Sequence, residues 1–330
     1  MILQLIGNRL FTADLEDIFA TKKQVANKEQ LLTTLFISVF LSLPVAIHGQ
    51  GYISTDYLSS SSLVDDLGNK YGSGNLMMVT GRYTLPLSTK LDDKGRTIAW
   101  AATLNCVYGK FNNQGVARYL NPDEAINAGF SITHMRPISE RWSILASLGC
   151  GIYAEPNEIS FKSLLANGST IFVYNLRKNL QFGFGFGLTN SYGVPMILPI
   201  GYLNWHNSGK YEISINLLSS GVKVSASTWL HRKFKIEAVA LEMDGLSAVM
   251  NIDGKSKIYS TLMMRTYISP SFYFTKQMSV FLGIGANWMR STSISERSFN
   301  GFFNSFSSDD NTPNLFKPSL RLSAGIRYRF

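Results

Sequence analysis

The chain has 330 residues, of which 45% are apolar and only 16% are charged, and its formal net charge is +9. Aromatic residues make up 12% of the chain, so it can bury a large core, and this excludes intrinsic disorder. Only the stretch 31–47 is long and uncharged enough to resemble a membrane-spanning helix, which excludes a polytopic helical membrane protein.

Residues 1–49 have the form of a long leader that ends in a secretory signal peptide. A basic region precedes the apolar stretch 31–47, and a small residue followed by a polar one comes after it. We predict cleavage after Gly49, which leaves residues 50–330 as the mature chain. An uncleaved membrane anchor is the alternative, but Pro44 and the short apolar core argue against it.

From residue 51 onward the dominant period of hydrophobicity is two. In the clearest case, LQFGFGFGLT at 180–189, Phe182, Phe184 and Phe186 point one way and three glycines point the other. Similar alternation occurs in the segments 77–85, 126–133, 211–217, 222–227 and 279–288. Helix signals are nearly absent, and the best candidate is one or two turns within 159–166.

The connections between these segments alternate between long and short. The expected long ones are 59–73, 110–124, 155–168, 243–257 and 291–317, and the short ones include 137–140, 177–179, 231–233 and 275–277. Long loops at one rim and tight turns at the other are typical of an outer-membrane barrel, whereas a soluble β-sandwich has no reason to keep this alternation. We therefore predict an all-β, transmembrane, antiparallel up-and-down β-barrel. Thirteen segments from residue 75 onward, together with 51–58, give about 14 strands, and 12 if two weak segments belong to loops.

The C-terminal segment SLRLSAGIRYRF has the pattern of a final barrel strand. Tyr328 and Phe330 lie on its apolar face, and an aromatic terminus of this kind resembles the assembly signal of Gram-negative outer-membrane β-barrels. The resemblance implies that outer-membrane lipid and the barrel-assembly machinery are the partners of this protein. An ordinary amphipathic edge strand is the alternative, but a long apolar edge would invite aggregation.

The run FGFGFGLTNSYGVPMILPIGYLNWH, preceded by PISERWSILASLGCGI, resembles a family of uncharacterised outer-membrane β-barrels, a domain of unknown function. The similarity covers most of residues 51–330. No activity and no functional residue is assigned to that family, so the resemblance implies a fold and a membrane and nothing catalytic.

Charged residues within the predicted strands fall on the polar phase, which lines the interior of a barrel. The candidate lumen-facing residues are Arg82, Glu212, Lys223, Glu237, Arg265, Arg321 and Arg327. An arginine that faced lipid at mid-depth would cost about 2–4 kcal/mol, so this phase is the one that a barrel requires. The basic excess favours a pore with a weak preference for anions, and a filled interior in which the charges pair is the alternative.

We find little sign of catalytic chemistry in the sequence. Cys106 and Cys150 fall on the apolar phase of segments two strands apart, about 9–10 Å, which is too far for a disulfide. His134, His206 and His231 share no metal-ligand spacing, so we expect no metal and no cofactor, and no motif supports nucleic-acid binding. The acidic residues of the long loops, Asp65, Asp66, Asp309 and Asp310, are expected to be solvated.

The sequence therefore predicts a passive pore or uptake channel in the outer membrane of a Gram-negative bacterium, for a small solute that the residues do not identify. One alternative is an outer-membrane lipid-modifying enzyme or hydrolase, for which Ser208 and His206 lie close in sequence. The other alternative is a structural or surface-interaction barrel with a filled lumen.

Overall fold

The computed structural model describes residues 49–65, 68–218, 221–301 and 314–329. The predicted signal peptide and the terminal Phe330 lie outside these residues. The strands are β1 (Gln50–Val64), β2 (Lys70–Leu91), β3 (Thr97–Gly115), β4 (Glu124–Pro137), β5 (Trp142–Ala154), β6 (Leu164–Arg177), β7 (Leu180–Thr189), β8 (Met196–Asn207), β9 (Tyr211–Leu218), β10 (Gly221–His231), β11 (Phe234–Ile252), β12 (Lys255–Tyr273), β13 (Met278–Glu296), β14 (Asn314–Phe316) and β15 (Ser319–Tyr328). Two short helical turns, α2 (Ala117–Leu120) and η1 (Phe161–Ser163), interrupt them. Among the described residues no helix has the length and hydrophobicity needed to cross a membrane.

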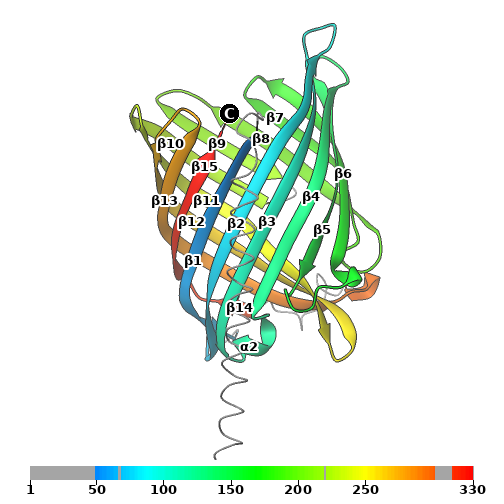
Figure 1. Ribbon diagram of the computed structural model, residues 1–330, viewed down its shortest axis with the longest axis vertical. Coiled ribbons are helices and arrows are strands. Elements are labelled where there is room, and N and C mark those ends of the chain that lie inside the picture. The colour runs from blue at the N-terminus through cyan, green and yellow to red at the C-terminus, as the bar shows by residue number, and fades with distance from the viewer. Residues whose placement is uncertain (1–48, 66–67, 219–220, 302–313, 330) are drawn as a thin grey trace, which may run out of the picture. The chain divides into compact units, whose positions relative to one another are not determined.

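The strands form one antiparallel sheet that closes on itself (Figure 1). Each strand from β1 to β13 pairs with its neighbour in sequence, and β15 closes the ring by pairing with both β13 and β1. The short β14 also pairs with β1 and β13, so β14 and β15 are two parts of one strand. Pro318, which has no backbone N–H to donate, lies at the interruption. The barrel thus has 14 strands, as predicted.

The two ends of the barrel differ. The near rim, as we call the end with tight turns, carries the start of β1 and the end of β15, and the opposite far rim carries α2 and η1. The difference is smaller than predicted, because 243–257 is not a long loop: β11 and β12 continue to a two-residue turn at Asp253 and Gly254. Both turn residues have positive φ, 54° and 75°, as a tight hairpin turn requires.

Other predicted loops are also partly strand. β1 and β2 extend into 59–73, β3 extends into 110–124, and β13 extends into 291–317, while the helix expected within 159–166 is only the short η1. These segments are polar on both phases, so alternation disappears from the sequence there. The backbone ladder does not depend on side-chain polarity, and the strands therefore continue.

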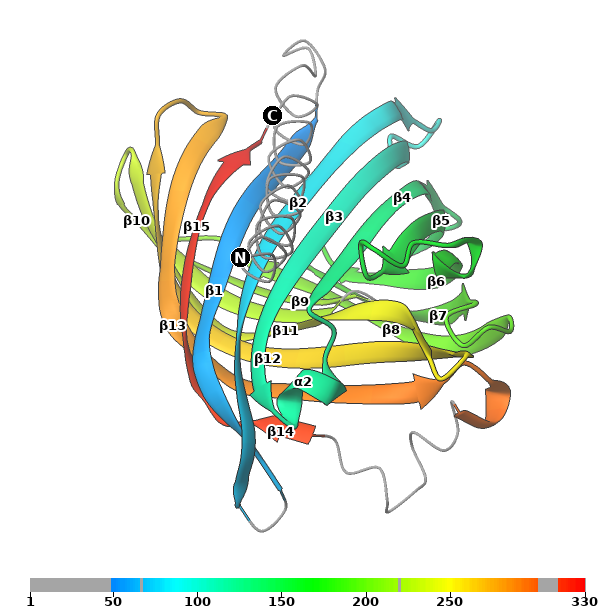
Figure 2. The same ribbon diagram turned by 60° about the horizontal axis from the view of Figure 1, so that its bottom comes forward.

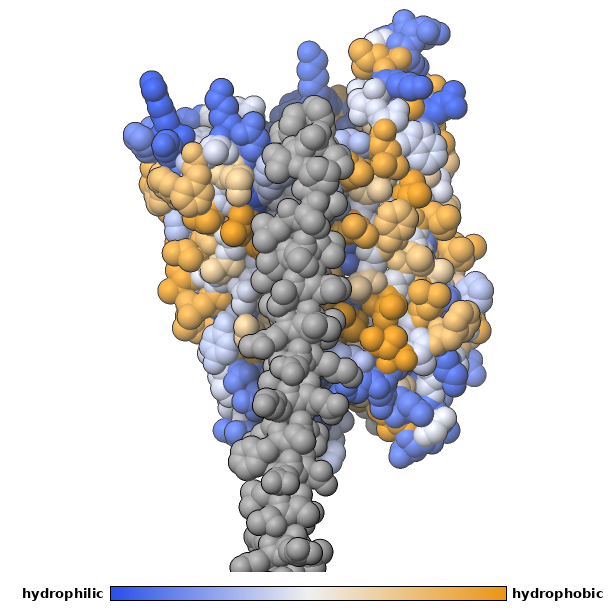
Figure 3. All heavy atoms as spheres, in the orientation of Figure 1, coloured by the Kyte–Doolittle hydropathy of each residue, from blue (hydrophilic) through white to orange (hydrophobic). Residues whose placement is uncertain are grey.

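The outer surface carries the apolar phase. Phe182, Phe184 and Phe186 are exposed by 44%, 62% and 57% on this surface, opposite the inward glycines of β7. Figure 3 shows apolar side chains gathered between hydrophilic ends on the visible face. Cys106 and Cys150 belong to the apolar phase too and are free, as predicted. An apolar belt that surrounds a closed sheet is what contact with lipid tails requires.

The far part of the barrel is asymmetric. Figure 2 shows β12 and β13 sweeping beneath the other strands towards the ends of β6 and β7. These long strands bring β11, β12 and β13 close to the opposite wall, and the consequences for the lumen are described next.

Candidate functional site

Three arginines, Arg265, Arg290 and Arg321, are buried on the inner face of the barrel, and two of them are paired with acidic residues. Arg265, exposed by 3%, contacts Asp244 and lies 3.4 Å from Glu242. Arg321, exposed by 5%, pairs with Asp56 on the adjacent strand β1. Arg290 on β13 has no ion pair among the described residues and instead donates a hydrogen bond to Gly74 O at 3.2 Å and lies over the Phe316 ring. Loss of one partner of a buried ion pair leaves an uncompensated charge, so the two pairs hold together the strands that carry them.

Three further predicted residues form ion pairs nearer to the near rim, where the side chains are partly exposed. Lys223 lies 3.0 Å from Glu237, and Glu212 lies 2.5 Å from Lys235. The side chain of Lys223 is 32% exposed and that of Glu212 is 25% exposed, although both face the barrel interior. Water therefore enters the near half of the lumen.

The remaining two predicted residues have no carboxylate within ion-pair distance among the described residues. Arg82 is exposed, and the Arg327 guanidinium lies 5.0 Å from the centre of the Phe281 ring. The structure thus brings five of the seven predicted residues into ion pairs, and Arg82 and Arg327 lie outside them.

Charge is confined to one side of the lumen, which we call the charged wall. It consists of the inner faces of β9 to β13, β15, β1 and β2. On β3 to β8, between the terminal residues of each strand, the inward side chains are uncharged. They bond to each other instead: Thr133 lies 3.2 Å from Ser147, and Gln181 donates to Asn175 at 2.6 Å.

Sequence analysis missed three acidic residues of the charged wall. Asp56 lies in a strand whose two phases are both mixed in polarity. A bulge between Val239 and Glu242 shifts the inward phase of β11 by one residue, so strict alternation places Glu242 on the wrong face. Asp244 lies in the segment predicted to be a loop. Asp244 would have been found if long strands had been predicted in the far half of the barrel. Glu242 would not, because no local sequence signal marks the bulge before it.

An apolar cluster fills the lumen in the far half, and we call it the apolar seal. Its buried members are Leu58, Leu76, Met78, Phe111, Ala125, Leu246, Ala248, Tyr259 and Met263. Phe111 on β3 and Tyr259 on β12 meet edge to face, with ring centres 5.9 Å apart, although four strands separate them around the ring. A Cβ atom on Gly109 would lie 2.7 Å from Leu246 Cδ1, so the two walls are in direct contact there.

Backbone contacts also cross the lumen. β4 and β11 are on opposite sides of the ring, equally distant in both directions. The Asn127 side chain, in the amide orientation that satisfies both partners, accepts a hydrogen bond from Ser247 N at 3.2 Å and donates to Ser247 O. Val249 pairs in parallel with Ala154 of β5. Together with the apolar seal, these contacts close the far half of the lumen between β4, β5 and β11.

The far-rim connections are fastened over this closure. Arg297, just after β13, donates hydrogen bonds to the backbone oxygens of Ser191 at 2.8 Å and of Lys162 at 2.9 Å. Asn251 N donates to the Glu158 carboxylate at 3.3 Å. These contacts join the ends of β11 and β13 to the connections on the opposite side of the barrel.

Carboxylates gather beside this closure. Burial raises the pKa of Glu155, and the nearby charges of Glu158, Asp123 and Glu124 raise it further. At the near rim the opposite holds: hydrogen bonds from Arg96 lower the pKa of Asp92. The far rim thus contains a carboxyl group that takes up a proton more readily than an ordinary glutamate.

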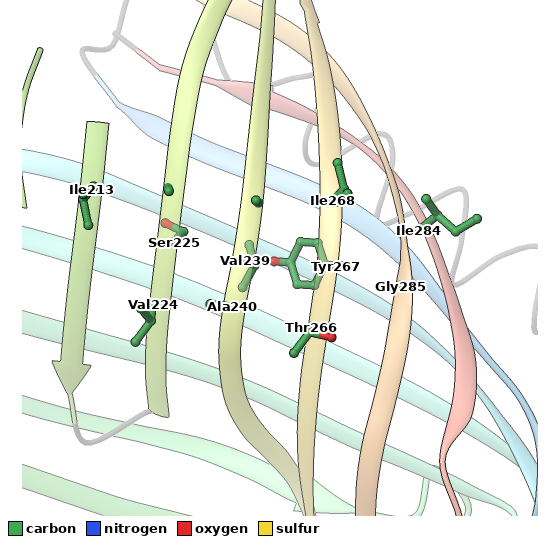
Figure 4. A pocket seen from close by; sticks show the side chains of 12 residues that line it. Ile213, Val224, Ser225, Val239, Ala240, Thr266, Tyr267, Ile268, Ile284 and Gly285 are labelled. Carbon is green, nitrogen blue, oxygen red and sulfur yellow. The ribbon is translucent and has the colours of Figure 1, made fainter. Parts of the chain in front are cut away.

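A shallow groove of about 430 Å³ lies across β9 to β13 (Figure 4). Its outer lining is apolar, with Ile213, Ala238 and Ile268 among the residues, and the ring of Tyr267 points towards Val239 between β11 and β12. It carries no reactive group. Among the residues that the structure describes, no group of three or more His, Cys, Asp or Glu side chains is arranged to hold a metal ion.

A closed antiparallel barrel with a lipid-facing apolar surface and a charged lumen defines an outer-membrane β-barrel protein. The chain belongs to the family "Domain of unknown function (DUF6268)", whose model matches residues 45–329. This confirms the resemblance seen in the sequence to an uncharacterised family of outer-membrane barrels.

Among proteins of curated function, none matches the chain. Several solved barrels are similar in outline. An outer membrane channel from Pseudomonas putida F1 has 9% identity and a TM-score of 0.43, and the match covers 87% of this chain and 97% of that one. The NanC porin has 6% identity and a TM-score of 0.30, with 85% and 100% covered. The translocator domain of the autotransporter NalP from Neisseria meningitidis has 12% identity and a TM-score of 0.30, with 93% and 98% covered. Sequence identities and TM-scores this low do not allow the function of these proteins to be assigned to this chain.

Proposed function

We propose that this protein is an outer-membrane channel for small polar solutes, with a weak preference for anions, and that the structure represents its closed state. Solute reaches the charged wall from the near rim and is stopped by the apolar seal. Conduction then requires the inner parts of β11 and β12 to move away from β3, β4 and β5.

The observation that carries this proposal is the partly exposed charge inside the near half of the barrel. A barrel that served only as a support would have a packed interior, whereas Arg82 is exposed and the pairs formed by Lys223 and Glu212 remain in contact with water. Charged side chains that line a water-filled lumen are the usual means by which barrel pores select among solutes.

The preference for anions is supported by the balance of inward charge. Basic side chains outnumber acidic ones: Arg82, Lys223, Lys235, Arg265, Arg290, Arg321 and Arg327 stand against Asp56, Glu212, Glu237, Glu242 and Asp244. Because most of these charges are paired, the net field is small and the preference is expected to be weak.

Conductance of the purified barrel in planar bilayers tests the proposal. We expect rare, small openings of the wild type and more frequent openings of Leu246→Ala, which removes part of the apolar seal. Leu262→Ala, on the outer face and 39% exposed, is the control and should behave as wild type. In a potassium chloride gradient the reversal potential should favour chloride. Folded Leu246→Ala protein that never conducts would reject the channel.

A barrel with a permanently filled lumen is the second candidate, and the apolar seal favours it. Its side chains come from opposite walls and are almost fully buried, as in a structural core. The same experiment separates the two functions, because a structural barrel stays silent when Leu246 is shortened.

We also propose that the last strand carries the signal for the barrel-assembly machinery. β15 closes the ring, with Tyr328 paired with both Gly51 and Met278 at the near rim. Deleting Phe330 and replacing Tyr328 by Ser should lower the amount of barrel recovered from outer membranes. Refolding of the same variant in detergent should be unchanged, since the defect concerns recognition and not stability.

A further inference from the structure

An aromatic surface lies inside the near half of the lumen. Trp229 on β10 is directly opposite Lys235 on β11, whose side chain pairs with Glu212, and the Lys235 ammonium lies 5.5 Å from the centre of the Trp229 ring. These side chains therefore share the inner face. The Trp229 and Tyr273 rings, from strands on either side of β11, approach to 4.8 Å. The two rings meet across β11, on the face of the sheet from which Lys235 projects.

This surface is open to water. Trp229 is 45% exposed, although it points away from lipid and belongs to no part of the apolar seal. The ring of Tyr273 is tilted by 44° to it, so it supports the indole without covering it. An indole face left in water inside a lumen loses hydrophobic stabilisation that a ligand can recover.

Polar groups surround the aromatic surface, and their charges cancel. Glu212 accepts hydrogen bonds from Ser227 at 3.3 Å and from Lys235 at 2.5 Å. Lys235, the basic group that lies over the Trp229 ring, therefore has an acidic partner in Glu212. Because Lys235 already occupies the position over the indole where a cationic ligand would bind, a cation is disfavoured.

We propose that Trp229 and Tyr273, together with the Lys235–Glu212 pair, form a binding site for the ring of a neutral sugar. A pyranose has an apolar C–H face, which fits a flat indole, and hydroxyl groups at its edge, which can exchange hydrogen bonds with Glu212, Ser227 and Lys235. Since the site has no net charge, an anionic sugar gains nothing over a neutral one. Sugar binding at this site does not depend on the proposed channel function. Only the idea that the bound sugar is a transported solute rests on it.

Binding can be measured without transport, which keeps the two proposals separate. The probe is maltotriose, added to the detergent-folded barrel while its heat-induced unfolding is followed by gel migration. A ligand that binds only the folded state raises the unfolding midpoint in a saturable way. Sorbitol, which has hydroxyl groups but no ring face, and glucuronate, which has a ring and a charge, are the comparison solutes. We expect saturable stabilisation by maltotriose, none by sorbitol, and no stronger effect from glucuronate.

The variants identify the site. Trp229→Ala should weaken the apparent affinity by about tenfold or more, as expected from the loss of one stacking surface. Trp229→Phe should recover part of it. Trp288→Ala, which removes a half-exposed tryptophan of the outer face, is the matched control and should bind as wild type. If Trp229→Ala does not fold, Tyr273→Leu serves instead, with a smaller loss expected.

Two results would overturn the proposal: no saturable effect of maltotriose on the wild type, or equal affinities for wild type, Trp229→Ala and Tyr273→Leu. A barrel that binds maltotriose through Trp229 but never conducts would instead contradict the channel function and leave the sugar site standing.

Discussion

Val249 of β11 pairs in parallel with Ala154 of β5, although every ladder between sequential strands of this barrel is antiparallel and β10 to β6 lie between the two along the chain. This bridge forms because β11 and β12 are long and lean across the lumen. It makes the far half of the barrel a packed core, while the near half stays open to water. The predictions below test this division.

The contact between Gly109 and Leu246 determines how closely the walls approach. Gly109→Val adds a side chain where Leu246 Cδ1 lies, so we expect overpacking to lower the free energy of unfolding by about 1–3 kcal/mol. Combining it with Leu246→Ala should cost less than the sum of the single changes, because each relieves the other. Urea unfolding measures all three, and Ala102→Val, on the outer phase of β3, should have little effect. If the losses of the two single variants simply add in the double variant, Gly109 and Leu246 are not in contact.

The pair of Asp56 and Arg321 is buried on both sides, with side chains only 7% and 6% exposed, and should be sensitive to loss of one partner. Asp56→Asn leaves Arg321 without its carboxylate partner, and we expect a loss of about 3–5 kcal/mol in the free energy of unfolding. Asp56→Asn combined with Arg321→Met should be less damaging than Asp56→Asn alone, because the uncompensated guanidinium is gone.

The partly exposed pair provides the comparison. Since Lys223 is 32% exposed, Glu237→Gln should cost no more than about 1 kcal/mol in the same unfolding experiment. Equal losses at Glu237 and Asp56 would show that water reaches the pair of Asp56 and Arg321 as freely as it reaches the pair of Lys223 and Glu237.

The lipid-facing phase is tested by a charge on β7. Phe184 is 62% exposed on the outer surface. At mid-depth in the membrane, Phe184→Arg should therefore lower the free energy of unfolding of the barrel in vesicles by about 2–4 kcal/mol. Thr84→Arg, on the inner phase of β2, should stay within about 1 kcal/mol of wild type. A larger loss of stability for Thr84→Arg than for Phe184→Arg would show that lipid contacts the opposite face of the sheet.

Stability should depend on pH through Glu155. Its pKa is raised by burial and by neighbouring carboxylates, so the folded state holds its proton more tightly than the unfolded state. The resulting stabilisation is complete below the ordinary glutamate pKa, about 4.3, and is lost as the pH rises through the raised pKa. The unfolding midpoint of wild type should therefore fall over that range, and Glu155→Gln should flatten the slope.

The near-rim Glu140→Gln is the control and should keep the wild-type slope. A slope that survives in Glu155→Gln would assign the pH dependence to other carboxylates.

The class of fold was predictable from residues 180–189 and from the lengths of the connections. Alternation with period two, exposed phenylalanines opposite glycines and tight turns at one rim are local features, and they led to the 14 strands observed. The far half was not predictable in the same way. Glu242 and Asp244 lie beyond a bulge in β11, where both phases mix polar and apolar residues and alternation carries no signal.

The sequence by itself determined which face meets lipid in strands such as β7, whose two phases differ in polarity, because that choice depends only on whether a side chain is apolar, and neighbouring residues reveal it. Which side chains meet inside the lumen was decided by the tertiary structure alone. Gly109 and Leu246, or Trp229 and Tyr273, come together only when the closed ring, its bulges and its uneven strand lengths set the distance between walls. That distance is a property of the whole barrel, and it determines where the lumen is open and where it is closed.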